Sequence, residues 1–596
     1  MTEHLTILIC FCASLAAAAQ TDALPPVRDT FADTWVATDG LDRALPLAND
    51  VRAPRTDRFV GVFYFLWLGR HGEAGPFDIS GILAKDPAAI NEPANPLWGP
   101  LHAPHHWGQP IFDYYVSDDE GVLRKHAQML GDAGVDVIIF DVTNQLTYPQ
   151  SWRALLKVFD ESRRAGWRVP QVAFLCPFGD PNKVVRELYD QLYSKNLYPH
   201  LWFRWRDKPL ILADPRKLGA DDDTAKAVRN FFTFRTPQPS YFTGPKRPGE
   251  WGWLEVFPQH VFTDPAGRPE EMTVGVAQNA VDGQLGVLSN PRAHGRSFHD
   301  GREPAPRDQD FTGRNFAEQW KRALDVDPPF LFVTGWNECI AGRFKQPTPF
   351  HGDGPVTFVD QFNEEFSRDI EPMAGGHGDA YYYQLVANVR RYKGVRPIPP
   401  LQPKPIAIDG DFADWRDVAP EFRDNVGDGV HRDHRGWDKG TRYTNQTGRN
   451  DLVAAKVSFD AENVYFYART KDPITPATDP NWMLLFIDTD QDPKTGWLGY
   501  DVLIGDADAQ TQTRKLNRNV RGKYEWAAQA EVRYRAAGNE IELAISRAAL
   551  GVTALPATLD FKWADNIQQT GDWSDFTLNG DTAPNDRFSY RAILKP

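Results

Sequence analysis

Three acidic residues follow strand-like runs of the sequence and are the first candidates for chemistry. Glu338 comes shortly after the apolar run that begins at Phe330, Asp141 ends the run that begins at Val135, and Glu255 lies in an aromatic-rich stretch. A carboxyl group can serve as an acid, a base or a nucleophile, and most enzymes that hydrolyse glycosidic bonds use two of them. We therefore predict that Glu338 is catalytic and that either Asp141 or Glu255 is its partner.

Each of these acids also has a structural role open to it. Glu338 could form a buried ion pair with Arg343, and Asp141 or Glu255 could accept hydrogen bonds from neighbouring loops. The catalytic interpretation is favoured at Glu338 because an aromatic ring and an amide, those of Trp336 and Asn337, stand directly before it.

Aromatic and polar side chains near these acids are expected to hold a sugar. The indole face is flat and amphipathic, which suits stacking on a sugar ring, and the chain contains 19 tryptophans among 596 residues. Because adjacent side chains rarely converge on one metal ion, we do not expect His105 and His106 to bind zinc, and we expect no metal in this site. The residues that we assign to substrate binding are Tyr64, His106, Trp107, Gln259, Trp336, Asn337 and Arg343.

Strand-like runs alternate with helical patterns between Phe59 and Lys393, which predicts parallel strands connected by helices. In the clearest unit, Ser117 and Glu120 form a capping box, Gly134 stands just past the helix, and a buried strand follows. Roughly eight such runs predict an α/β fold, a (β/α)8 TIM barrel over residues 57–395, with the acids at one face. The other expected strands are 59–66, 171–175, 210–213, 253–257, 273–277 and 330–334.

Proline marks a boundary between two domains. Residues 396–405 are rich in proline and are expected to form an extended linker. Beyond it, residues 406–596 show short alternating strands with turn signals, which predict an all-β sandwich domain. Because such a linker leaves few contacts to cross it, we expect the two domains to fold separately.

The first residues are typical of an export signal. An apolar run, Leu5–Leu15, is followed by four small residues, Ala16–Ala19, although no Lys or Arg precedes the run. We therefore expect residues 1–19 to be a signal peptide and the protein to be secreted or periplasmic. No later stretch is apolar and long enough to predict a membrane span.

Charge and cysteine content exclude several classes of protein. The formal net charge of −14 disfavours a nucleic-acid partner, since phosphate binding needs a basic surface. Beyond the signal peptide only Cys176 and Cys339 remain, which are too few for a disulfide framework or a zinc site. We expect a monomer whose partner is a carbohydrate substrate.

The first domain resembles glycoside hydrolase family 99, which contains endo-α-mannosidases and is related to family 71 α-1,3-glucanases. The resemblance rests on His106-Trp107, Tyr114–Asp119, Asp132–Asp141, Lys208–Leu212 and Trp336–Glu338, and it implies a TIM barrel that acts on α-linked glycans. Members of the family carry two catalytic glutamates in the motif N-E-W-x-E-G. Asn337, Glu338 and Gly342 match this motif, but Cys339 and Ala341 replace the tryptophan and the second glutamate. The second carboxyl group is therefore expected from Asp141 or Glu255.

The second domain resembles family 9 carbohydrate-binding modules and DOMON-like sandwiches. The resemblance rests on Ile408–Trp415 and Ile487–Asp501 and implies glycan binding. Within the latter stretch, Asp488, Asp490 and Asp492 have the spacing of a calcium loop, but the loop lacks the bidentate glutamate, and such residues are also common in turns. We expect no cofactor, with structural calcium in this loop as the alternative. Trp482 and Trp497 are candidates either for stacking on sugars or for core packing.

These features together favour a secreted glycoside hydrolase that cleaves an α-linked glycan or polysaccharide. Two alternatives stay open. The missing second glutamate favours a barrel that binds carbohydrate at the cell surface without cleaving it. The early barrel motif is shared with sugar-processing proteins of O-antigen assembly, but an export signal argues against that interpretation.

Overall fold

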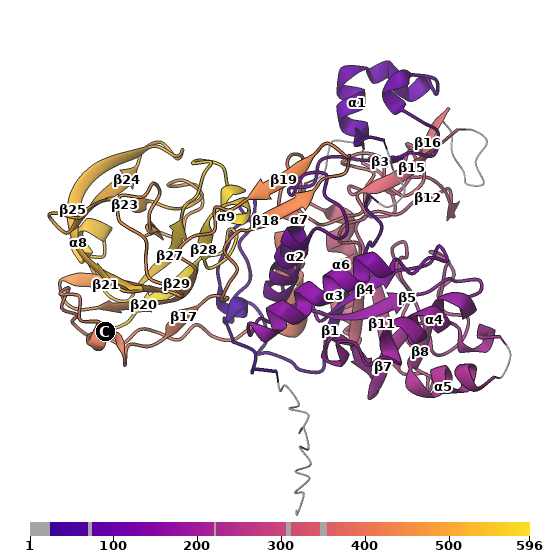
Figure 1. The fold of residues 1–596 in the computed structure, drawn as a ribbon, viewed down its shortest axis with the longest axis horizontal. Helices are drawn as coiled ribbons and strands as arrows, with labels where there is room; N and C mark the ends of the chain where they lie inside the picture. The colour runs from indigo at the N-terminus through magenta and orange to yellow at the C-terminus, as the bar shows by residue number, and fades with distance from the viewer. Residues whose placement is uncertain (1–23, 70–73, 220–221, 305–310, 346–354) are drawn as a thin grey trace, which may run out of the picture.

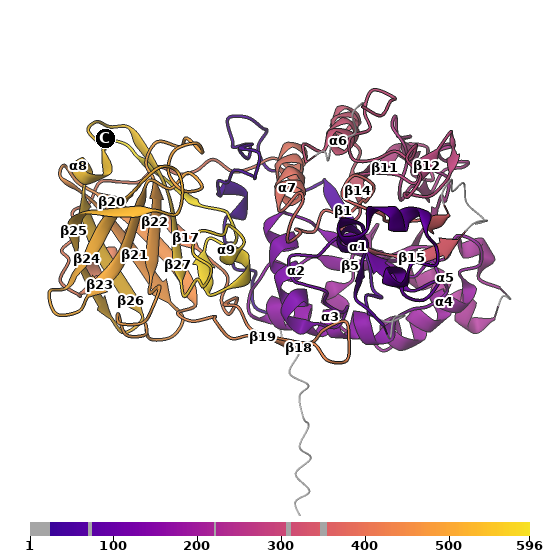
Figure 2. The same cartoon turned by 90° about the horizontal axis from the view of Figure 1, so that it is seen from above.

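The computed structural model describes residues 24–69, 74–219, 222–304, 311–345 and 355–596. They form a mixed α/β unit and an all-antiparallel unit, which lie side by side in both views (Figures 1 and 2). The expected signal peptide, residues 1–19, lies outside the described residues. Within the described ranges, no helix has the length and apolar character needed to cross a membrane.

The α/β unit is built around a nearly closed, barrel-like sheet. Its parallel strands follow the order β11–β14–β1–β4–β5–β7–β8–β9, so that the last strand along the chain, β14, returns to pair with β1. The ring is completed by β10 (Phe262–Thr263), which is antiparallel to β11 and accepts a 2.8 Å hydrogen bond from the backbone N–H of Gly249, next to β9. The parallel strands are β1 (Phe59–Tyr64), β4 (Val137–Asp141), β5 (Gln171–Leu175), β7 (Lys208–Leu212), β8 (Thr233–Pro237), β9 (Glu250–Trp251), β11 (Pro269–Gly275) and β14 (Phe330–Thr334).

Helices cover the outside of this sheet (Figure 2). Their apolar residues pack on the buried strands; in α6, for example, Phe316 and Trp320 are both buried. The helices are α2 (Glu120–Asp132), α3 (Pro149–Arg164), α4 (Asn182–Leu188), α5 (Asp223–Phe231), α6 (Arg314–Val326) and α7 (Ala380–Lys393). The structure therefore confirms the predicted α/β fold with parallel strands and connecting helices.

A small lobe stands over one end of the sheet (Figure 1). It holds a four-stranded sheet in the order β16–β15–β3–β2, with a short helix packed beside it. Its elements are β2 (Phe77–Asp78), α1 (Ile79–Lys85), β3 (Pro104–His106), β15 (Ile340–Lys345) and β16 (Val356–Phe358). The remaining short strands of the α/β unit are β6 (Arg204–Trp205), β12 (Ala280–Val281) and β13 (Gln284–Leu285).

The local signals at α2 place its start two residues too early. Asp119, not Ser117, is the N-cap, and its side chain accepts hydrogen bonds from the backbone of Gly121 and Val122. Ser117 instead accepts a 2.8 Å hydrogen bond from the backbone of Leu68, at the end of β1. The predicted capping box is therefore wrong, because a tertiary contact takes the serine hydroxyl. The C-terminal signal is correct, since Gly134 has φ of 78°.

Two strands of the barrel-like sheet differ from the predicted pattern. The stretch 253–257, expected to be a strand, is irregular, and the strand β9 lies before it. The strand β8 was not predicted, because its sequence Thr-Phe-Arg-Thr-Pro has a single apolar side chain before the proline and lacks the apolar run of a buried parallel strand. The stretch 253–257 and the strand β8 both lie near β9, on the side of the sheet where the ring is completed.

The second unit is a single antiparallel sheet that curls toward closure. Its order is β17–β20–β21–β26–β25–β24–β23–β22–β27–β28, with β29 also paired to β27. Its two ends approach each other where the backbone N–H of Leu452 donates a 2.6 Å hydrogen bond to Asp581. The strands are β17 (Glu421–Arg423), β20 (Leu452–Phe459), β21 (Asn463–Thr470), β22 (Leu484–Asp488), β23 (Val502–Asp508), β24 (Thr513–Asn519), β25 (Trp526–Ala537), β26 (Glu540–Ser546), β27 (Ala557–Asp565), β28 (Asp581–Ala583) and β29 (Tyr590–Leu594).

The prediction of an all-β domain is confirmed, but the strands form one continuous barrel-like sheet and not two separate sheets. The alternating pattern shows which face of a strand is buried and does not distinguish a sandwich from a curled sheet. Two single-turn helices, α8 (Arg547–Leu550) and α9 (Asp575–Leu578), lie between strands.

Contacts between the two units are extensive, so the expectation that few cross the boundary is wrong. The segment that precedes β1 runs along the second unit, where Val36 forms a backbone bridge with Ser589 and Arg28 donates to the backbone of Asp424 and Val453. Gln128 on α2 donates a 3.1 Å hydrogen bond to Asp586. The proline-rich segment 396–405 is extended, but it lies along the second unit and forms backbone hydrogen bonds with it.

A hairpin from the second unit also reaches the α/β unit. It consists of β18 (Arg432–Arg435) and β19 (Arg442–Asn445) and lies beside α2 (Figure 1). Arg432 donates a 2.9 Å hydrogen bond to Asp119, the N-cap of α2, and Arg435 contacts Asp118 at 3.3 Å. The hairpin therefore couples the second unit to the start of a helix that packs on the barrel-like sheet.

The Arg432–Asp119 pair predicts a measurable coupling between the units. Asp119 is fully buried and the Arg432 side chain is 13% exposed, so Arg432→Ala leaves a buried carboxylate without its cation. We expect a loss of about 2 kcal/mol in the free energy of unfolding, measured by denaturant titration. The matched variant Arg435→Ala removes a contact whose arginine is 48% exposed and should cost less than about 1 kcal/mol. Equal losses in the two variants would contradict this assignment.

Candidate functional site

Glu338 lies beyond the end of β14, where a neighbouring segment holds it in place. The segment 368–371 hydrogen-bonds to the backbone of Gly335 and Trp336, and the Asp369 carboxylate accepts a 2.7 Å hydrogen bond from the backbone N–H of Glu338. Arg368 donates a 2.8 Å hydrogen bond to the Glu338 carboxylate. Glu338 therefore pairs with Arg368 and not with Arg343.

Acidic groups outnumber the arginine at this position. Arg368 also lies 3.3 Å from Asp360, whose side chain is 41% exposed. Burial raises the pKa of Glu338 well above its usual range; Arg368 opposes the rise, and Asp360, Asp369 and Asp141 add to it. Burial raises the pKa of Asp369 to about 6. One cation shared among several carboxylates favours the protonation of at least one of them.

Asp141 belongs to the same electrostatic group. It ends β4, which is separated from β14 only by β1, and it is 7% exposed. Burial raises its pKa, a hydrogen bond from the backbone of Thr143 lowers it, and the charges of Asp360 and Arg368 act on it in opposite directions. The structure thus brings Asp141 and Glu338 together at the carboxyl ends of the parallel strands.

An aromatic surface adjoins the acids. The guanidinium of Arg368 lies 5.6 Å from the ring centroid of Trp253, which is partly exposed. Around Trp253 stand the rings of Phe63, Phe178 and Tyr241, at centroid distances of 5.8, 5.9 and 5.7 Å. A partly exposed indole beside carboxyl groups can stack on a sugar ring while the acids act on its bonds.

A buried hydrogen-bond network supports the segment that carries Glu338. The Tyr64 hydroxyl meets His126 at 2.8 Å, and the other ring nitrogen of His126 meets Glu371 at 2.8 Å. Tyr115 donates to Glu371 at 3.0 Å and accepts from Asn337 at 3.2 Å. All five side chains are at most 2% exposed. Tyr64 and Asn337, assigned to substrate binding, therefore lie in the core and position the strand ends.

Glu255 is not brought together with Glu338. Its carboxylate accepts a 2.7 Å hydrogen bond from the backbone N–H of His260 and contacts the imidazole at 3.0 Å. The backbone carbonyl of Glu255 accepts a hydrogen bond from Gln319 on α6, and Glu255 is fully buried. Gln259, also fully buried, donates to the backbone of Thr273 and Gln319. The Gln259 side chain thus connects α6 to β11, whereas the Glu255 side chain holds His260.

The remaining residues assigned to substrate binding are also buried. The His106 ring packs against Tyr114 and against Trp437 from the β18–β19 hairpin, with centroids 4.8 and 4.7 Å away. Trp107 and Trp336 are at most 2% exposed. Arg343 donates to the backbone carbonyls of Pro93 and Gly99. These contacts organise the small lobe and its junction with the second unit.

Sequence patterns missed Arg368, Asp360 and Asp369. They lie in 359–379, a stretch with neither helix nor parallel strand, so no periodicity marked it. The stretch Ser-Arg-Asp-Ile-Glu has three charged residues and one isoleucine, a composition that gave no signal of burial.

The suspected calcium loop brings together Asp488, Asp490 and Asp501, but not Asp492. Backbone and hydroxyl donors already serve these carboxylates: Asp488 accepts from the N–H of Asp490 and Gln491, and Asp501 accepts from Thr489. Nearby, Trp482 and Trp497 are 5% and 6% exposed and pack in the core. These hydrogen bonds use one oxygen each of Asp488 and Asp501, and structural calcium in this loop stays a prediction, whereas neither tryptophan offers a stacking face.

Comparison with known proteins gives similarity at a low level. Neither a protein-family description nor a curated protein matches the sequence. Among solved structures, one match is the family 99 endo-α-mannosidase from Bacteroides thetaiotaomicron in complex with bis-tris-propane. The identity is 15% and the TM-score 0.33, over 57% of this chain and 99% of that chain. A second structure of that enzyme matches over the same shares at 16% identity and a TM-score of 0.33. β-Glucuronidase 3 from Bacteroides uniformis matches at 10% identity and a TM-score of 0.27, over 81% of this chain and 64% of that chain. These values are too low to establish a family or an activity.

Glu255 predicts a pH-dependent contribution to stability. Burial raises its pKa to about 7, and His260 opposes the rise. Between the unfolded pKa of about 4.3 and pH 7, the folded protein binds the proton more tightly than the unfolded chain, so this group's contribution falls as pH rises. Glu255→Gln should therefore gain stability relative to the wild type by about 2–3 kcal/mol between pH 4.5 and pH 7.5, measured by denaturant unfolding.

The control is Glu161→Gln on α3, whose glutamate side chain is 49% exposed. Its free energy of unfolding should stay parallel to that of the wild type over this pH range. A parallel profile for Glu255→Gln as well would show that the Glu255 carboxyl group titrates normally.

Proposed function

We propose that this chain is a secreted or periplasmic glycoside hydrolase whose first unit is a (β/α)8 barrel with Glu338 and Asp141 as its carboxyl pair. The observation that carries the proposal is the placement of two buried acids within electrostatic reach of each other, Asp141 at the end of β4 and Glu338 after β14, beside Arg368 and a partly exposed tryptophan. The carboxyl ends of barrel strands are where catalytic groups of such folds are found. The choice of an α-linked glycan rests on the sequence motifs shared with family 99.

The two acids are suited to different roles. Burial and three neighbouring carboxylates raise the pKa of Glu338 well above its usual range, so it is the better proton donor to a leaving group. Asp141 keeps a hydrogen bond to its charged form from the backbone of Thr143, which suits a base or nucleophile. Arg368 holds Glu338 in position and limits the rise of its pKa.

A second candidate function is carbohydrate binding without hydrolysis. The direct Arg368–Glu338 contact favours it, because an ion pair occupies one of the two carboxyl groups. Under this alternative, substitution of Glu338 changes affinity and there is no turnover to lose.

The proposal predicts the effect of removing each acid. Wild-type protein is first screened against α-linked polysaccharides and oligosaccharides to find a substrate. Glu338→Gln and Asp141→Asn should then each lower kcat by at least about 10²–10⁴-fold with little change in binding, because the amide cannot ionise or donate an acidic proton. Rates come from product release, and binding comes from calorimetry.

The matched control is Glu255→Gln, which removes another buried carboxyl group of the same unit and should retain turnover. An aryl glycoside with a good leaving group should restore much of the rate of Glu338→Gln but not of Asp141→Asn, since only the proton donor becomes dispensable. A folded wild type that binds an α-glycan and cleaves none would overturn the hydrolase proposal.

For the second unit we propose glycan binding at its junction with the first. A cavity of about 690 Å³ is lined from both units, with Trp167, Tyr443 and Trp573 among the lining residues. Trp573 is partly exposed, and the guanidinium of Arg587 lies 5.7 Å from its ring. An indole at the edge of a polar cavity offers a stacking face for a sugar ring.

Trp573→Ala should weaken attachment to an insoluble glycan substrate about tenfold, in line with the loss of one aromatic contact. Turnover of a small soluble substrate should be unchanged, because Trp573 lines the junction cavity, whose lining does not include Glu338, Asp141 or Arg368. Trp526→Ala, which removes a partly exposed tryptophan of the same unit outside the cavity, is the control in a pull-down assay. Equal attachment of both variants would contradict binding at the junction.

A further inference from the structure

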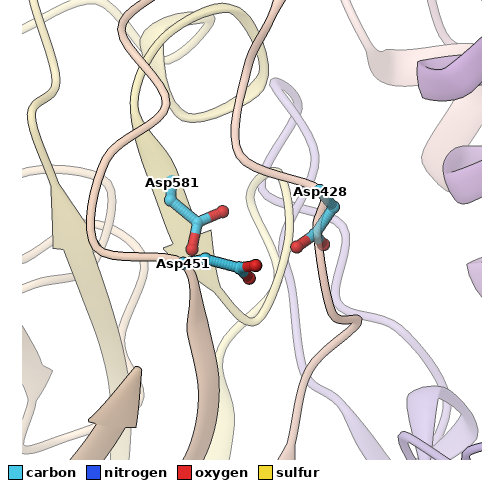
Figure 3. A group of neighbouring side chains, drawn as sticks. All are labelled: Asp428, Asp451 and Asp581. Carbon is cyan, nitrogen blue, oxygen red and sulfur yellow. The ribbon is translucent and has the colours of Figure 1, made fainter. Parts of the chain in front are cut away.

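A second group of carboxylates lies in the antiparallel unit, away from the strand-end site. Asp428 belongs to the loop after β17, Asp451 directly precedes β20, and Asp581 begins β28 (Figure 3). One carboxylate oxygen from each lies within 4.8 Å of the others. These residues meet where the two ends of the curled sheet approach each other.

Burial makes this arrangement costly without a counter-charge. Asp428 and Asp581 are 4% and 3% exposed, and the fully buried Asp424 lies nearby. Burial, followed by repulsion from Asp451, raises the pKa of Asp428 to about 7. Buried carboxylates in such proximity must be protonated or must bind a cation.

Several of the oxygens lack a partner. Among the described residues, neither oxygen of Asp428 nor Oδ1 of Asp451 has a hydrogen bond of ordinary geometry, although Asn585 lies close enough to lower the pKa of Asp428. In Figure 3 the carboxylates of Asp428 and Asp451 point toward each other. The unpaired oxygens therefore face the space that the three residues share.

The remaining oxygens fix the cluster in place. Oδ2 of Asp451 accepts a 2.7 Å hydrogen bond from the backbone of Gly427, and Oδ2 of Asp581 accepts one of 2.6 Å from Leu452. Asp451 thus keeps its other oxygen, Oδ1, for a ligand. The geometry is held by backbone donors and does not depend on the ligand alone.

Neighbouring lysines do not neutralise the cluster. Lys471 lies 3.9 Å from Asp451, but its side chain is 50% exposed. Lys125 on α2 lowers the pKa of Asp428 and Asp581 from a distance. The buried Lys562 interacts through charge with Asp581, but its ammonium group donates to the backbone of Pro584, so among the described residues no buried cation forms an ion pair with Asp428 or Asp451.

We propose that Asp428, Asp451 and Asp581 form a binding site for one divalent cation, namely Ca²⁺. The donor set consists of oxygen alone, which favours hard cations over zinc and other metals that prefer nitrogen or sulfur. Ca²⁺ accepts several carboxylates in irregular geometry, whereas Mg²⁺ requires near-octahedral coordination and keeps more water. The site differs from the Asp488 loop in burial, since Asp428 and Asp581 are 4% and 3% exposed, whereas Asp488 and Asp501 are partly exposed and Asp490 is exposed.

Cation binding here would fix the loop that leads into the β18–β19 hairpin. Asp428 lies four residues before Arg432, which binds the N-cap of α2 at Asp119. The cation would join the loop that leads into β18 to the first residues of β20 and β28. Its expected effect is structural, on the junction between the two units.

The test is calcium binding by the full chain after dialysis against a chelator. Isothermal titration with CaCl₂ should show one equivalent that Asp428→Asn loses, with affinity reduced at least about tenfold. Saturating Ca²⁺ should raise the Tm of the wild type by several degrees, since a ligand that binds only the folded state stabilises it, and should leave that of Asp428→Asn unchanged. In chelator the variant should be at least as stable as the wild type, because one buried charge has been removed.

Asp490→Asn is the control, since it alters the other acidic cluster and should keep this equivalent of Ca²⁺. The proposal is overturned if the wild type binds no Ca²⁺ at millimolar concentration. It is also overturned if Asp428→Asn binds as much Ca²⁺ as the wild type, or if Asp490→Asn loses the only equivalent bound.

Discussion

The pairing of β14 with β1 determines the geometry on which the candidate site depends. It returns the last parallel strand to the first, and because β1 also pairs with β4, the chain after β14 and the end of β4 flank a single strand. Glu338 and Asp141, distant in the sequence, are thereby placed within electrostatic reach of each other. The buried network around His126 and Glu371 then fixes the backbone that carries Glu338.

Local sequence patterns correctly predicted the features that depend on residues close together in the chain. The strands that hold Asp141 and Glu338 were recognisable as continuous apolar runs, and the glycine after α2 adopts the positive φ expected of it. Patterns failed where long-range contacts prevail. Arg368 lies in an irregular segment, which has no periodic pattern. Tyr64 and Asn337 are polar residues that hydrogen-bond within the core, and their spacing along the chain does not indicate their partners. The same limit applies to the curled sheet, whose closure no strand pattern encodes.

Two regions of the molecule concentrate buried acids, and they differ in how charge can be balanced. At the strand ends, Arg368 supplies a fixed positive charge to Glu338 and Asp360. Around Asp428 no cationic side chain of the described residues makes a direct contact with the carboxylate. A protein that buries negative charge must provide a cation, a proton or an external ion. The first region therefore has a cation in direct contact and still favours one bound proton, whereas Asp428 depends on a proton or a ligand.

The segment before β1 has a consequence for how the protein is made. Val36 exchanges backbone hydrogen bonds with Ser589, and Trp35 packs against Phe588, close to the opposite end of the chain. During synthesis this segment leaves the ribosome long before its partner residues, which follow the whole α/β unit in the sequence. Contacts of such sequence separation form late and slow the folding of a chain. The segment before β1 must therefore stay without its native partner until the second unit has been synthesised, and the two units can dock only after that point.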